Sequence, residues 1–311
     1  MFIVRERMRK SIDSSPAPAG ALRRARWLLL GGALLLASCS AGLRVGYNNA
    51  DTALAWTLNR YLDLDETQQA LVKARSAKFL AWHRGSQLRD YAALLAQART
   101  AVEREVTPAE VLALNQELNE RLARLGEAAA PDLAELALTL RPAQIERLRD
   151  KLADSNQEWR REAKVDGPGF REARLRRTVD RAESWLGSVS RAQKELLRAL
   201  LAERPNDALT WSEEGARRNA EFIALLERIA RERPALAEAT TWMRGFFAEL
   251  ARPPDAARRA FVQQAREANA ELIARLLNSA SPSQRAHLVR KLAGYEEDAT
   301  LLAAGAANGR S

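Results

Sequence analysis

The 311-residue sequence has only one cysteine, two histidines, 15 glycines and 11 prolines. A single cysteine excludes an intramolecular disulfide and any zinc site built from several cysteines. Scarce glycine and proline leave few forced helix ends, and abundant Ala, Leu, Arg and Glu favour helix. No stretch after residue 39 alternates apolar and polar residues with β-branched enrichment over the length of a strand. The sequence therefore predicts an all-α protein.

Motifs typical of metal-binding or phosphate-binding sites are also scarce. Neither His83 nor His287 has a second histidine four positions away with a carboxylate between, so a helical zinc motif is absent. The glycines at 167 and 169 lack the Lys-Ser/Thr that follows in a phosphate-binding loop. We therefore expect no catalytic activity, no cofactor and no metal site, and a structural role for each histidine.

One pair of residues points to an enzyme. Glu183-Ser184 is similar to the Glu-Ser pair that lytic transglycosylases place at a helix end, where Glu is the general acid and base. The Gly-Leu-Met-Gln run of that family does not follow here. An enzyme acting on peptidoglycan is therefore the alternative to a protein without catalytic activity.

The first 38 residues have the layout of an export signal. Seven basic side chains and two acidic ones precede or flank an apolar run at 27–36. That run is too short to cross a bilayer as a helix, which takes about 20 residues. Leu36-Ala37-Ser38-Cys39 follows it and resembles the lipobox of bacterial lipoproteins.

The lipobox resemblance implies that residues 1–38 are a cleaved signal peptide and that fatty acyl chains such as palmitate are attached at Cys39. Residues 39–50 then form a lipidated tether, and several acyl chains make the anchor stable. Ser40 stands where an Asp retains lipoproteins in the inner membrane. We therefore expect the periplasmic face of the outer membrane in a Gram-negative host. Export excludes nucleic acid as a partner, although the net charge is +9.

Residues 51–311 have the periodicity of amphipathic helices. Apolar residues recur at spacings of three and four, so each helix has one face to bury. Predicted helices span 51–62, 65–104, 107–139, 141–164, 170–186, 190–203, 207–232, 234–250, 253–278 and 281–304. The second of them has a predicted break at Gly85 and the third at Pro131. These lengths predict an elongated multi-helix bundle or helical array, with one lobe or with two lobes divided near 165–170.

A recurrent helix-start signal places Asp, Thr or Ser three residues before Gln or Glu. It occurs at 65–68, 107–110, 190–193 and 281–284, and with Arg at the cap position at 141–144. The cap side chain accepts a backbone N–H, and the Gln or Glu reaches back to the N–H of the cap residue. Three copies also resemble the Leu-Thr-x-x-Gln motif of small stress-induced periplasmic chaperones, which are helical dimers that cradle unfolded clients. The motifs either only start helices or also belong to such a function.

A wider resemblance covers nearly all of the chain after the lipobox. It is to an uncharacterised family of proteobacterial lipoproteins, domain of unknown function 6279, and rests on Tyr47–Asp51, Trp56, Tyr61–Leu64, Trp82-His83-Arg84, Tyr91, Gln284–Leu288 and Lys291-Leu292. The resemblance implies a lipoprotein with an all-helical body and carries over no activity. We expect its aromatic residues in the first two helices to anchor the core.

The densest basic stretch lies at 160–181. Arg171, Arg174 and Arg181 fall on one helical face and are candidates for docking an anionic partner, because Arg pairs bidentately with phosphate and carboxylate. The helices on either side of 165–170 would then form a hairpin with these arginines on one rim. An ordinary solvated face is the alternative.

We expect an outer-membrane-anchored lipoprotein that binds protein or peptide partners as an envelope adaptor or chaperone.

Overall fold

The computed structural model describes residues 40–165, 167, 169–204 and 207–308, and these form twelve helices and no strand. The predicted all-α class and helical array are confirmed. In chain order the helices are α2 (Ser40–Asn48), α3 (Ala50–Leu62), α4 (Glu66–Ser86), α5 (Leu88–Ala101), α6 (Pro108–Thr139), α7 (Pro142–Ala163), α8 (Phe170–Leu186), α9 (Arg191–Ala202), α10 (Asp207–Glu232), α11 (Leu236–Ala251), α12 (Ala256–Asn278) and α13 (Pro282–Asn308).

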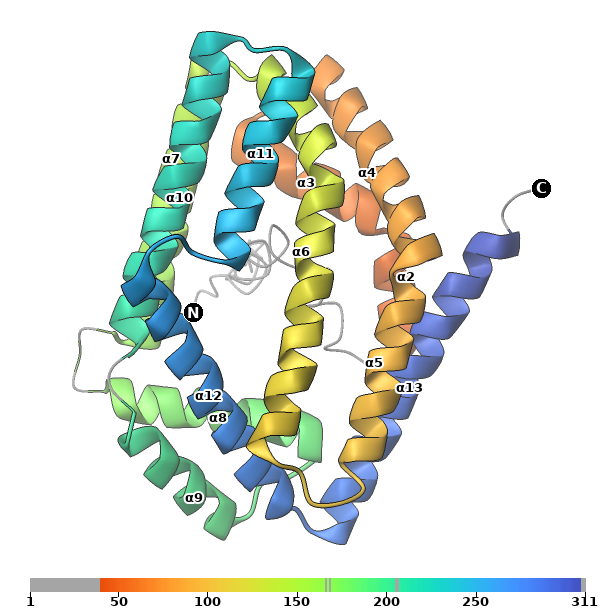
Figure 1. Cartoon of the computed structure of the whole chain (residues 1–311), viewed down its shortest axis with the longest axis vertical. Coiled ribbons are helices and arrows are strands. Elements are labelled where there is room, and N and C mark those ends of the chain that lie inside the picture. The colour runs from red at the N-terminus through yellow and green to blue at the C-terminus, as the bar shows by residue number, and fades with distance from the viewer. Residues whose placement is uncertain (1–39, 166, 168, 205–206, 309–311) are drawn as a thin grey trace, which may run out of the picture.

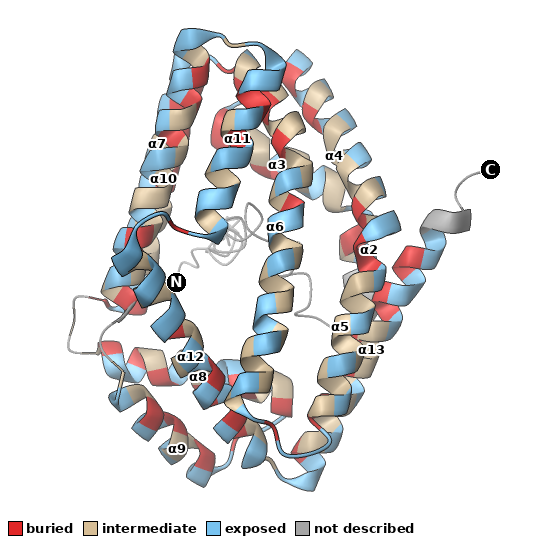
Figure 2. Ribbon diagram, viewed as in Figure 1, coloured by how far each residue is buried: buried red, intermediate tan, exposed pale blue. Residues whose placement is uncertain are grey.

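The molecule is long, with α7 and α10 along one side and α4 and α13 along the other (Figure 1). Helix α6 runs between these two sides, and α8 and α9 lie across one end. The predicted hairpin of the helices around 165–170 does not form, because α8 crosses the end of α7 instead of running back along it. The buried residues form stripes along one side of each helix, as amphipathic packing requires (Figure 2).

Two breaks were predicted inside the longest helices, and the structure has only one of them in its described residues. The break predicted at Gly85 lies two residues later, at Gln87 between α4 and α5. The break predicted at Pro131 is wrong, because α6 continues through this residue. A proline inside a helix removes one hydrogen bond and costs about 3 kcal/mol. Ala130, Ala134 and Ala137 are buried on either side of it, and their packing holds the helix together.

The segment predicted as a tether is packed against the body. Residues 40–48 form α2, in which Tyr47 is buried and its hydroxyl lies 2.7 Å from Nδ1 of His83. Arg44 of the same helix is paired with the buried Asp298 of α13 at 3.1 Å. Cys39, the predicted lipid-attachment residue, lies outside the described residues. Any anchor at that position is one residue away from a helix of the folded domain.

Two large apolar cores hold the helices together. The first joins α3, α4, α6, α7, α10 and α11 around residues such as Ile145, Ile229 and Met243. The second joins α8, α9, α12 and α13 around Leu186 and Leu197, and it includes Val102 after α5. Each core draws on residues from both sides of 165–170, so a division of the chain at that linker does not describe the packing of the described residues.

Four of the five helix-start motifs meet in pairs. The side chains of Gln68 and Gln144 donate to each other's Oε1, at 3.1 and 2.7 Å, and those of Gln193 and Gln284 do so at 3.0 and 2.9 Å. All four are buried, and each also accepts the N–H of its own cap residue. We call the two pairs the glutamine clasps. The motifs therefore start helices, as predicted, and also join helix starts that lie far apart in the sequence.

Each clasp also satisfies the ends of the preceding helices. Gln68 and Gln144 donate to the carbonyls of Thr139 and Asp63, and Gln193 and Gln284 donate to those of Ser279 and Ser188. In all four cases the accepting carbonyl lies five residues before the glutamine of the partner motif. Orphan carbonyls at helix ends need partners when they are buried, and the clasp amides supply them.

Candidate functional site

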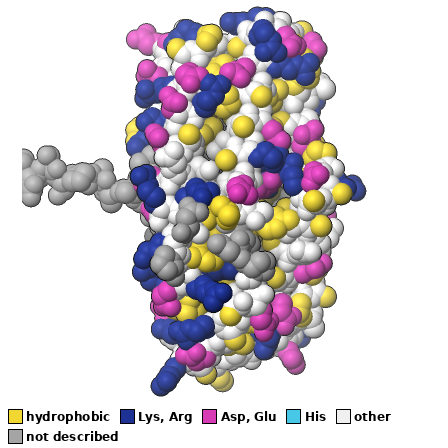
Figure 3. Space-filling model, turned by 90° about the vertical axis from the view of Figure 1, so that its left-hand side faces the viewer, with side chains coloured by type: hydrophobic (Ala, Val, Ile, Leu, Met, Phe, Trp, Pro, Cys, Tyr) yellow, Lys and Arg dark blue, Asp and Glu magenta, His cyan; other side chains and the backbone are white. Residues whose placement is uncertain are grey.

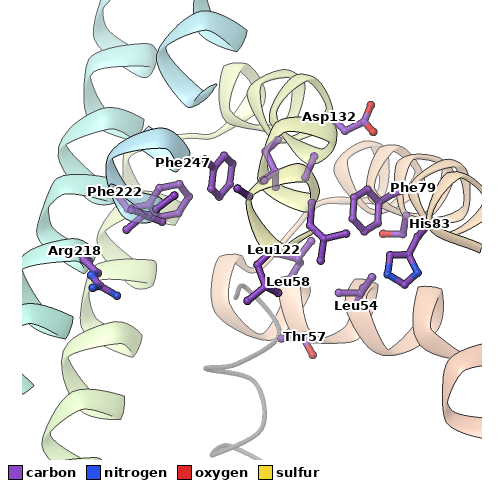
Figure 4. Close-up of a pocket in the computed structure, with 18 of the residues that line it drawn as sticks. Leu54, Thr57, Leu58, Phe79, His83, Leu122, Asp132, Arg218, Phe222 and Phe247 are labelled. Atoms are coloured by element: carbon purple, nitrogen blue, oxygen red, sulfur yellow. The ribbon is translucent and has the colours of Figure 1, made fainter. Parts of the chain in front are cut away.

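A cavity of about 630 Å³ lies between α3, α4, α6, α10, α11 and α12. This volume is within the range of about 300–1,000 Å³ that is typical of ligand sites. The lining is mostly apolar and takes at least one side chain from each helix: Leu58, Phe79, Leu122, Phe222, Phe247 and Val262. Phe222 and Phe247 lie toward one end and Phe79 and His83 toward the other, with Leu58 and Leu122 between them (Figure 4).

Small residues on α6 shape one wall of the cavity. Gly126 and Ala129 follow Leu122 at spacings of four and three, on the face of α6 that lines the cavity. A Cβ on Gly126 would lie 2.9 Å from Cγ of Phe247, which is closer than packed atoms allow. Glycine at this position therefore lets α11 approach α6 and sets the Phe247 ring as part of the wall.

Aromatic side chains surround His83 at one end of the cavity. The imidazole is 3% exposed, its Nδ1 is bonded to the Tyr47 hydroxyl, and its Nε2 has no hydrogen-bond partner among the described residues. The rings of Tyr47, Phe79 and Tyr91 have centroids 5.7, 6.3 and 5.5 Å from the imidazole. Burial lowers the pKa of His83 to about 4, so the imidazole is neutral at pH 7. Burial also raises the pKa of Tyr47 to about 12, against the opposing effect of Arg84.

Three motif residues of the family resemblance, Tyr47, His83 and Tyr91, therefore meet in space. Tyr61 is buried in the first core as predicted. The prediction is wrong for Trp56, which is 56% exposed with the Arg60 guanidinium 5.4 Å from its ring centroid. Periodicity places Trp56 on a helix but does not say which face of that helix meets a neighbour.

The charged residues of the lining are three arginines and one aspartate. Arg75 is paired with Glu135 at 2.7 Å, and Asp132 with Lys78 at 3.3 Å. Arg218 is bonded to the buried Glu214, which also binds Arg217 and Arg258. The remaining one, Arg266 of α12, is half-buried and has no ion pair with any residue that the structure describes.

The candidate catalytic and metal-binding residues of the sequence do not come together in one site. Glu183 is paired with the exposed Lys194 at 3.4 Å, and the Ser184 hydroxyl donates to the Arg181 carbonyl. His287 of α13 packs beside Gly187, whereas His83 lines the cavity. Within the described ranges, no three His, Cys, Asp or Glu side chains are placed to hold a metal ion.

The three arginines predicted for docking all lie on α8 and none lines the cavity. Arg171 and Arg181 are exposed, and Arg174 is half-buried with its guanidinium 5.8 Å from the Phe170 ring centroid. Basic and acidic side chains are interspersed on the face formed by α7 and α10 (Figure 3). None of the described helices is long and apolar enough to cross a membrane.

The sequence predicted the helices that form the cavity but did not predict the cavity itself.

No curated protein and no solved structure matches the chain. A model described as a family of unknown function (DUF6279) matches residues 60–241. This match covers more than half of the chain and includes α4, α6, α7 and α10 entirely. The chain therefore belongs to the DUF6279 family of unknown function.

Proposed function

We propose that this chain is a lipoprotein of the cell envelope that binds a protein or peptide partner as an adaptor or chaperone and has no catalytic role. A lipid at Cys39 anchors it at the periplasmic face of the outer membrane. The observation that carries the binding role is the apolar cavity, whose walls come from eight helices. Apolar side chains of a partner bind in this cavity, where they are buried against its walls and removed from water.

The energetics favour an apolar segment as the ligand. Removal of apolar surface from water contributes about 25 cal/mol per Å², so one buried Leu or Phe side chain contributes about 1.5–3 kcal/mol. Unfolded polypeptides expose such side chains. The resemblance of three helix starts to the Leu-Thr-x-x-Gln motif of client-binding periplasmic chaperones supports the same class of ligand.

The position of α2 connects the cavity to the proposed anchor. Gly46, Tyr47 and Ala50 line the cavity, and α2 begins at Ser40, next to the proposed lipid-bearing residue. A membrane-attached chain would thus hold its binding cavity within about one helix length of the lipid, where newly exported polypeptides pass.

Filling the cavity tests the binding role. Ala129→Phe adds an aromatic ring to the lining, and Ala113→Phe adds the same ring at an exposed position of the same helix. We expect the first variant to bind a permanently unfolded client, reduced and carboxymethylated α-lactalbumin, about tenfold more weakly, the loss of one buried side chain of contact. The control should bind as the wild type does. Equal binding by both variants, with helicity intact by circular dichroism, would exclude the cavity as the client site.

Two further measurements test the anchor and the alternative function. Cys39→Ala should abolish acyl labelling and maturation of the precursor; a variant still cleaved and membrane-bound would show that the anchor lies elsewhere. Purified protein should release nothing from peptidoglycan. Product release that disappears in Glu183→Gln would replace the binding role by the enzymatic alternative.

A further inference from the structure

The lining of the cavity includes Asn115 and Asn119 of α6 and Arg266 and Asn269 of α12, and we call this part of the lining its polar end. These two helices pack against each other. Arg266 is half-buried and has no ion pair with any described residue, whereas Arg75 and Arg218 of the same lining each have a carboxylate partner. A partly desolvated guanidinium without an anion is costly, since the charge has lost part of its hydration without gaining a counter-charge.

The asparagine amides that line the cavity on these two helices still have hydrogen-bond donors to offer. Oδ1 of Asn115 accepts the Nδ2 group of Asn119 at 2.7 Å, and Oδ1 of Asn269 accepts the guanidinium of Arg204 at 2.8 Å. These bonds fix the orientation of the two amides and leave the Nδ2 groups of Asn115 and Asn269 without a partner among the described residues. The exposed Asn115 and Asn269 can therefore donate N–H groups to a ligand, Asn119 keeps its Oδ1 as an acceptor, and Arg266 adds a full positive charge.

We propose that this end of the cavity binds a carboxylate, so that the preferred peptide ligand combines apolar side chains with one acidic side chain that pairs with Arg266. The inference rests on the proposed function, because it names a second contact for the peptide that fills the apolar part. A guanidinium pairs bidentately with a carboxylate, and charge-assisted hydrogen bonds are about twice as strong as neutral ones. Of the three arginines in the lining, Arg266 is the one that has no carboxylate partner among the described residues.

The test compares two peptides that differ at one side chain: acetyl-Leu-Phe-Leu-Glu-Leu-Phe-amide and its counterpart with Gln in place of Glu. We expect wild-type protein to bind the Glu peptide about tenfold more tightly, the usual order for a hydrogen bond to a charged group. Because the site is only half-buried, this preference should decrease between 50 and 500 mM salt. Arg266→Gln should remove the preference and leave the affinity for the Gln peptide unchanged.

Two other variants provide controls. Arg275→Gln removes a more exposed arginine of the same helix, one that is paired with Glu271, and should keep the tenfold preference. Arg266→Lys retains the charge without the bidentate fork, so it should keep part of the preference. A further measurement needs no variant of the protein. Carbon NMR follows the titration of the peptide's Glu side chain, and the pKa of this side chain should fall on binding.

The outcomes separate the inference from the proposed function. Equal affinities for the two peptides in the wild type, a preference that survives Arg266→Gln, or an unchanged pKa of the bound Glu would each overturn the carboxylate site while leaving the apolar cavity as a peptide site. If neither peptide binds and dodecanoate binds instead, the ligand is a lipid, and both proposals fail in their choice of a peptide.

Discussion

The buried histidine gives the sharpest prediction about stability, because its pKa differs strongly between the folded and unfolded chain. The pKa of His83 is lowered by burial from 6.5 to about 4 in the folded protein. The unfolded state therefore binds more protons than the folded state between these two values. Stability from the neutral imidazole is fully present above pH 6.5, decreases as the pH falls from 6.5 to 4, and is lost below pH 4.

The magnitude follows from linkage. Each pKa unit of difference corresponds to about 1.36 kcal/mol, so the full loss below pH 4 is about 3 kcal/mol, and about 2 kcal/mol of it is already lost at pH 5. His83→Phe keeps an aromatic ring in the cluster and removes the titration. The wild type should therefore lose about 2 kcal/mol more than the variant between pH 7.5 and pH 5.

Urea unfolding of both proteins at pH 7.5, 6 and 5 measures this difference, since ordinary carboxylates change charge mainly below pH 5. NMR of the imidazole nitrogens checks the cause directly. His287→Gln leaves His83 as the single histidine of the chain, so its titration can be followed without overlap. Parallel stability curves for wild type and His83→Phe, or a folded-state pKa of His83 near 6.5, would refute the reasoning.

Three further predictions concern the packing. Gln193→Leu should cost about 3 kcal/mol by urea unfolding, because it removes both bonds to the buried Gln284 and leaves the Ser279 carbonyl and the Ser190 N–H without these partners; a loss below about 0.5 kcal/mol, the range of ordinary surface changes, would contradict the clasp. Gly126→Ala should destabilise by about 1–3 kcal/mol through its clash with Phe247, and a stabilised variant would mean that α6 and α11 are not in close contact. Replacement of the three candidate docking arginines of α8 by Gln should change stability by less than about 0.5 kcal/mol and weaken binding to anionic vesicles, a salt-dependent effect. Unfolding of that triple variant would show that these arginines are structural.

The sequence predicted the helices well because their signals are local. Capping residues, their partners three positions later and the apolar periodicity are all contained within a few turns, and the ends of helices such as α8 and α10 agree with the predicted ranges. Pro131 was misjudged for the opposite reason. Its local cost is overcome by buried alanines that meet other helices, and such packing cannot be inferred from neighbours in the sequence.

The candidate site was not predicted because its parts are distant in the sequence. Leu122 and Phe222 lie on amphipathic helices, and a residue that lines a cavity has the same periodicity as one that fills a core. Arg266 gave no signal, since a single arginine on an amphipathic helix is ordinary. Its significance comes from its surroundings, because it lines an apolar cavity and has no carboxylate partner in the described part of the chain. One usable signal was the scarcity of histidine, because it drew attention to His83 before its burial was known.

The clasps explain how a chain with a large cavity keeps its helices in register. In both clasps the glutamine follows its cap by three residues, and the carbonyl it reaches precedes the partner glutamine by five. Such identical offsets mean that each pair is an approximate twofold arrangement in which both members make the same bonds. The first clasp fixes the starts of α4 and α7, and Val72 and Leu148, one turn further along these helices, already line the cavity. Buried hydrogen bonds at a fixed point thus substitute for the packing that the cavity itself does not provide, so its walls remain in place.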